Sequence, residues 1–176
     1  RLVVLCDRRG SHLNPADLRN KPRTPLDALA RRMDIVTFKA ELADSLAKEL
    51  VVRAGNYANH EMKSFDLGIH PWHGYIEPSF FTTLDTAGLK EIGDWKLYNF
   101  ADISNEKWPA VQHLAKWMRA FYESNTEKHS TQLFMAAAEV VNSATIAEAL
   151  KHYRTTPTFF VSVYNPDDPS FANYCA

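Results

Sequence analysis

The spacing of apolar residues changes from a helical to a strand period between residues 34 and 70, and this change constrains the fold most. Over residues 34–57, apolar side chains recur every three or four positions, as on one stripe of a helix: Ile35, Phe38, Leu42, Leu46 and Leu50. In residues 64–70 they alternate instead, with Phe65, Leu67 and Ile69 separated by Ser64, Asp66 and Gly68. Alternation of this kind predicts a strand with one buried face. A helix followed by a strand is therefore the first expectation.

The rest of the chain adds strands and helices in an order typical of an α+β domain. Residues 75–85 and 94–101 read as two further strands, and their short connections favour an antiparallel meander. Helical patterns follow over 108–122 and 131–154, with a bend or restart expected near Ser143. The apolar run at 158–164 is typical of an inner strand covered on both faces. We predict an antiparallel sheet of about four strands, the meander plus a C-terminal strand, with three to four helices mainly on one face.

Charge divides the chain just before Met33. Residues 1–32 carry eight Lys or Arg against three Asp or Glu, whereas the remaining residues carry 12 against 18. We interpret 1–32 as a poorly ordered basic extension and 33–176 as a single domain. The acidic body gives no reason to expect nucleic-acid binding, and no run is long enough for a membrane span. A cytoplasmic location is the default expectation.

The segment HPWHGYIEP at residues 70–78 is the most suggestive chemically. Two histidines and a carboxylate, His70, His73 and Glu77, could bind zinc or iron if their side chains converged, and Asp66 could lie near them. Pro71 disfavours a helix at this point, so the spacing of the histidines does not place them on one face. We favour a tight hairpin turn and keep the metal site, or a metal-dependent hydrolase, as an alternative.

Other routes to catalysis find little support in the sequence. Cys6 and Cys175 lie near the two ends, where they could form a terminal bridge or remain free thiols, and neither looks like a nucleophile. Asp167 and Asp168 stand in a turn-forming NPDDP segment. The chain has no G-x-S-x-G elbow and no phosphate-binding glycine loop, so we expect no cofactor and lean against an enzyme.

The surplus of aromatic residues around the predicted sheet is consistent with a sheet covered on both faces, which we favour, and with a recognition surface. Phe80 and Phe81 are adjacent and must point to opposite faces, so the aromatic side chains cannot all share one core. They either cover the second sheet face or form an exposed, acidic binding surface. The residues proposed for that surface are Trp72, Tyr75, Glu77, Asp94, Trp95, Asp167 and Asp168.

This surface leads to the functional hypothesis. In size, charge and lack of cofactor motifs, the chain is similar to small uncharacterised bacterial proteins, including immunity proteins that neutralise partner toxins by binding. That resemblance implies a non-enzymatic protein-binding module with a basic protein partner. The apolar helical stripes leave a structural or oligomeric subunit as a further alternative, with the oligomeric state open.

Overall fold

The computed structural model describes residues 33–103, 106–124 and 126–176. The predicted basic extension and Cys6 lie outside these residues. The described part of the chain belongs to one compact unit, Met33–Ala176.

Four α-helices follow from the apolar patterns in the described residues. The first, α3 (Ile35–Arg53), begins where Asp34 Oδ1 accepts a hydrogen bond from Thr37 N at 2.8 Å, and it continues as a short 3-10 turn to Tyr57. Its predicted stripe is buried from Phe38 to Leu50. A 3-10 turn starting at Pro109 leads into α4 (Gln112–Ser124), which is followed by α5 (Thr126–Val141) and α6 (Ala144–Leu150). Ser143 caps α6 by accepting from Ile146 N, which confirms the predicted restart.

The sheet has three strands in the order β2-β1-β3. Strands β1 (Glu61–His70) and β2 (Tyr75–Thr82) form the predicted antiparallel hairpin, and Gly74 supplies a positive φ of 69° in its turn. Strand β3 (Arg154–Ser162) pairs with β1 in parallel. The sheet is therefore mixed.

Two predictions about the sheet are wrong. Residues 94–101 make one isolated bridge, between Leu97 and Phe80, because Asn99 at φ 40° and Asp102 at φ 28° turn the chain out of an extended path. The C-terminal strand is an edge strand with exposed residues, and it is parallel because a long helical crossover returns the chain in the direction of β1. The buried central position belongs to β1.

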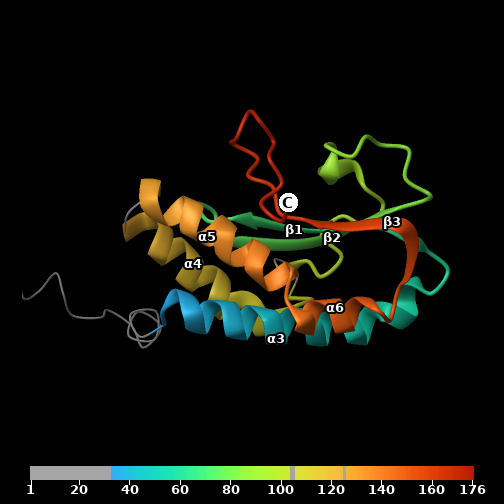
Figure 1. The fold of residues 1–176 in the computed structure, drawn as a ribbon. Coiled ribbons are helices and arrows are strands. Elements are labelled where there is room, and N and C mark those ends of the chain that lie inside the picture. The colour runs from blue at the N-terminus through green and yellow to red at the C-terminus, as the bar shows by residue number, and fades with distance from the viewer. Residues whose placement is uncertain (1–32, 104–105, 125) are drawn as a thin grey trace, which may run out of the picture. The chain divides into compact units, whose positions relative to one another are not determined.

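In the part of the chain that the structure describes, the α-helices cover one face of the sheet and irregular segments lie over the other (Figure 1). Phe65, Leu67 and Ile69 of β1 are fully buried, as the alternation predicted. The segments on the second face are residues 83–98, which carry the short 3-10 helix η2 (Ile92–Asp94), and residues 163–176. We call this second face the open face.

Among the described residues, no single helix is long and apolar enough to cross a membrane. Lys128–Val141 and Ala144–Leu150 are long and apolar enough only when they are counted together, and the two helices are bent by 54° relative to each other.

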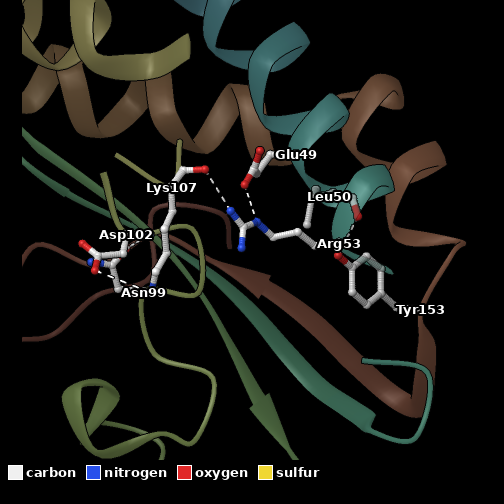
Figure 2. Close-up of polar contacts among 7 residues, drawn as sticks. All are labelled: Glu49, Leu50, Arg53, Asn99, Asp102, Lys107 and Tyr153. Carbon is white, nitrogen blue, oxygen red and sulfur yellow. Dashed lines mark hydrogen bonds and ion pairs between the residues drawn. The ribbon is translucent and has the colours of Figure 1, made fainter. Parts of the chain in front are cut away.

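Polar contacts fasten the loop after β2 to the end of α3 (Figure 2). The Arg53 guanidinium pairs with Glu49 and donates a hydrogen bond to the Lys107 carbonyl at 2.9 Å. On the other side of the helix end, the Tyr153 hydroxyl donates to the Leu50 carbonyl at 2.7 Å. These bonds fasten the C-terminal end of α3 to Lys107 and to Tyr153, the residue that precedes β3.

Candidate ligand-binding site

A buried carboxyl group stands at the centre of the open face. In the sheet, Asp66 of β1 lies between Ser79 of β2 and Ser162 of β3. Its side chain is on the face opposite Phe65 and Leu67, because neighbouring residues of a strand point to opposite sides. Asp66 is only 1% exposed, and the Ser162 hydroxyl donates a hydrogen bond to Asp66 Oδ1 at 2.6 Å.

Burial makes this carboxyl group reluctant to ionise. The loss of water raises the pKa of Asp66 to about 7, and the nearby negative charge of Glu77 acts in the same direction. The hydrogen bond from Ser162 and the charge of His70 oppose this increase without cancelling it. Near neutral pH, Asp66 therefore exists in both protonated and ionised forms.

A chain of hydrogen bonds lies beside Asp66 on the same face. His70 Nε2 is 3.1 Å from Glu77 Oε2, and the Tyr98 hydroxyl donates to the same oxygen at 2.7 Å. Burial raises the pKa of Glu77, but the bonds from His70 and Tyr98 and the charge of His70 outweigh it, so the net pKa is lowered. Burial and the Glu77 carboxylate raise the pKa of Tyr98. The hydrogen bonds from His70 and Tyr98 therefore favour the ionised form of Glu77.

Backbone contacts bring Tyr98 to this position. The segment that was predicted as a third strand follows the outer edge of β2, where Phe80 N donates to the Leu97 carbonyl and Phe100 N donates to the Pro78 carbonyl, both at 3.1 Å. Asn99 N also donates to Ser79 Oγ at 2.9 Å. Three bonds thus fix the backbone on both sides of Tyr98.

These groups line a cavity of about 220 Å³, which we call the open-face pocket. Its polar side includes Asp66, Ser79, His70 and Glu77, and its other walls include Tyr98, Tyr164 and Phe171. Gly68 forms part of the floor, where an added Cβ would lie 3.3 Å from the Glu77 carbonyl oxygen. A glycine inside a strand often marks a place where a ligand or backbone approaches closely.

The C-terminal segment supplies the remaining wall. Tyr164 stacks on Phe171 with 4.3 Å between ring centroids, and Tyr164 also forms an isolated bridge with Asn173. Cys175 is a free thiol in this segment, and burial, with the Asp66 charge contributing, raises the pKa of Cys175 to about 12. The thiol is therefore neutral near pH 7 and is a poor nucleophile.

The predicted metal ligands are only partly brought together. His70 and Glu77 are in contact, whereas His73 is exposed in the turn and packs beside the Tyr75 ring, with centroids 5.9 Å apart. Within residues 33–103, 106–124 and 126–176, no three His, Cys, Asp or Glu side chains form a group that could hold a metal ion. The histidine pair therefore does not converge on one point.

The predicted binding surface is divided among different environments. Tyr75 is 45% exposed and Trp72 is half-buried at the turn. Trp95 is only 3% exposed, because its ring packs on Phe81 at 5.1 Å and its Nε1 donates to the Gly88 carbonyl. The expectation that Trp95 is an exposed anchor is thus corrected: it covers the open face of the sheet.

The acidic members of that surface are also separated by environment. Asp94 and Asp167 are exposed, and Asp168 accepts hydrogen bonds from Ser170 within the predicted turn. Glu77 instead lines the open-face pocket. The carboxylates do not form one continuous set with the aromatic turn.

Sequence reasoning missed Ser79 and Tyr98, which line the pocket, and Ser162, which hydrogen-bonds Asp66. Ser79 becomes a neighbour of Asp66 through the register of the hairpin, and Ser162 through the parallel pairing of β3, which the sequence does not specify across a long crossover. Gly68 was the available signal, because a lone glycine in an alternating strand points to a close approach.

The chain matches no protein-family model, no curated protein and no solved structure. The function of the pocket is therefore argued from its own residues.

Proposed function

We propose that the protein binds a small ligand in the open-face pocket. The observation that carries this proposal is Asp66, a carboxyl group that is 1% exposed and lines a cavity instead of being enclosed in the core. Burying a carboxyl group costs stability unless strong partners compensate, and Ser162 is the side chain that hydrogen-bonds Asp66 among the described residues. A buried group with a perturbed pKa in a cleft is a recognised indication of a functional site.

The hydrogen-bonded chain beside Asp66 supports the same role. Convergent polar groups on an otherwise apolar wall are typical of small-molecule sites, where they fix the orientation of the ligand. His70, Glu77 and Tyr98 come from β1, β2 and the loop after β2, and their mutual contacts order this wall. Asp66 can in addition accept or release a proton near pH 7.

A substitution at the floor of the pocket tests the proposal. Gly68→Val places a branched side chain where even a Cβ would contact the Glu77 carbonyl oxygen at 3.3 Å, so it fills the cavity. Gly55→Val is the matched control, because an added Cβ at Gly55 meets nothing within 4 Å. A fragment library would be screened against the parent protein by NMR. Fragments that shift resonances of the pocket in the parent should bind the Gly55→Val variant as tightly as the parent. They should bind the folded Gly68→Val variant at least about tenfold more weakly than the parent. Equal binding to both variants would contradict the proposal.

A second candidate function is the binding of a basic protein partner at the hairpin turn. The specific observation is a cluster of aromatic rings: Trp72 contacts Tyr122 of α4 and His70, and the exposed Tyr75 lies beside His73. Exposed Tyr and Trp side chains are frequent anchors in interfaces. If a folded Trp72→Ala/Tyr75→Ala variant captured the same partners as the parent, this candidate would be excluded.

A further inference from the structure

The two carboxyl groups of the pocket differ in whether a positively charged side chain is paired with them. Glu77 is paired with His70, at 3.1 Å. Asp66 makes no ion pair with any lysine or arginine of the described residues, and its recorded side-chain partner is the neutral hydroxyl of Ser162. Lys90 is exposed at the wall of the pocket. Its Nζ lies 5.3 Å from the centroid of the Phe171 ring, in a cation–π contact. An ionised Asp66 would therefore be a buried negative charge without a cation of its own.

The walls around Asp66 suit a positively charged group. Tyr98 and Tyr164 line the pocket, and the faces of aromatic rings attract ammonium and guanidinium ions. Phe171 already holds the Lys90 ammonium in this way. Ile92 and Pro166 add apolar surface that could contact a short hydrocarbon stem.

Size limits what the pocket can take. Its volume of about 220 Å³ lies below the range of about 300–1,000 Å³ that is typical of sites for drug-sized ligands. A nucleotide or an oligosaccharide would be too large, whereas a group the size of one long side chain would fit.

Resting on the proposed ligand-binding role, we infer that the open-face pocket takes a small organic cation, an ammonium or guanidinium group on a short apolar stem, with the cation at Asp66. The same chemistry could be offered by a free amine or by a lysine or arginine side chain of a protein partner.

Binding of such a cation is linked to the proton on Asp66. A cation favours the ionised carboxylate, so its affinity increases as the pH rises through the pKa of Asp66, which is about 7. The other titratable groups facing this site are His70 and Glu77 from the strands, Tyr98 and Lys90 from the loop after β2, and Tyr164 and Cys175 from the C-terminal segment. Because Tyr98, Tyr164 and Cys175 have raised pKa values, they remain neutral while Asp66 titrates.

The test is an NMR titration with four probes of similar size: butylammonium, butylguanidinium, neutral butanol and anionic pentanoate. The two cations should shift resonances of the pocket, with a Kd at least about tenfold lower than that of either other probe, and the affinity should rise about tenfold from pH 6 to pH 8. Asp66→Asn should weaken cation binding at least about tenfold. Asp44→Asn is the matched control, since it removes an exposed carboxylate that pairs with Lys48 on α3.

The outcomes separate this inference from the proposed function. If butanol bound as tightly as butylammonium, the cation inference would be overturned while ligand binding at the pocket would stand. If no probe and no library fragment shifted the pocket resonances, both would be overturned. The pH dependence is measured on the parent protein, so a poorly folded Asp66→Asn variant would not prevent a decision.

A further titration, with a lysine-rich peptide, identifies the source of the cation. A lysine-rich peptide that binds the parent at least about tenfold more tightly than butylammonium, and loses this advantage in the Asp66→Asn variant, would assign the cation to a protein side chain. Equal affinities would assign it to a free small molecule.

Discussion

Replacing Asp66 by asparagine should change how the stability of the protein depends on pH. Below its ordinary pKa of 3.8, this carboxyl group is protonated in both the folded and the unfolded chain. Between 3.8 and about 7, the unfolded chain has lost the proton while the folded chain retains it, so stability falls as pH rises. Above about 7 the loss is complete.

The size of this effect follows from the two pKa values. At about 1.36 kcal/mol per pH unit, a pKa raised from 3.8 to about 7 corresponds to about 4 kcal/mol of lost stability in total. About 3 kcal/mol of this loss falls between pH 5 and pH 8. Asp66 is 1% exposed, so solvent does little to screen the penalty. Asparagine has nearly the same shape, can still accept the bond from Ser162 and carries no charge at either pH.

The assay is urea unfolding of the parent and the variant at pH 5 and pH 8. The free energy of unfolding of the Asp66→Asn variant should gain about 3 kcal/mol relative to the parent between the two pH values, because the other titrating groups affect both proteins alike. Asp44→Asn, at an exposed position on α3, serves as the control and should follow the parent within about 0.5 kcal/mol. A relative gain below about 1 kcal/mol for Asp66→Asn would refute the argument that burial governs this carboxyl group.

Three further substitutions test other parts of the structure. Tyr98→Phe removes the hydrogen bond to Glu77, so the pKa of Glu77, measured by NMR titration, should rise toward its ordinary value of 4.5; an unchanged pKa would exclude this bond as a cause of the lowered value. Since a lowered carboxyl pKa stabilises the protein above pH 4.5 and that stability is lost as pH falls, the variant should lose less stability on acidification than the parent. Tyr153→Phe should cost about 1 kcal/mol in urea unfolding, because its hydroxyl bonds the Leu50 carbonyl inside the protein, whereas no measurable cost would argue against a buried bond. Leu46→Ala should cost about 2–5 kcal/mol at a fully buried position, and Val52→Ala, 77% exposed on the same helix, should cost less than about 0.5 kcal/mol; similar costs would contradict the assigned orientation of α3.

Local patterns in the sequence were sufficient to predict the helices and the hairpin. The stripe from Phe38 to Leu50 and the alternation of Phe65, Leu67 and Ile69 each record a single buried face, which is a property of neighbouring residues. Pro71 and Gly74 marked the turn between β1 and β2. The α+β class of the fold followed from the order of these elements.

The remaining features depend on contacts between distant residues. An apolar run such as Phe159–Phe160–Val161 fits an inner or an edge strand equally well, and only the tertiary path decides that β3 lies at the edge, parallel to β1. Positive φ angles at Asn99 and Asp102 overrode the strand-like pattern of residues 94–101. The contact of His70 with Glu77 could be anticipated from the hairpin, but the approach of Tyr98 and Ser162 could not.

The parallel pairing of β3 has a consequence for the order in which the protein folds. Asp66 and Ser162 are 96 residues apart in sequence, whereas the β1–β2 hairpin joins residues that are close together. Closing a long loop costs more chain entropy than forming a hairpin, and contacts of high sequence separation slow folding. We therefore expect the hairpin and the helices to form before β3 docks. On this expectation, Asp66 stays in contact with water, where ionisation carries no burial penalty, until the docking of β3 brings Ser162 to it.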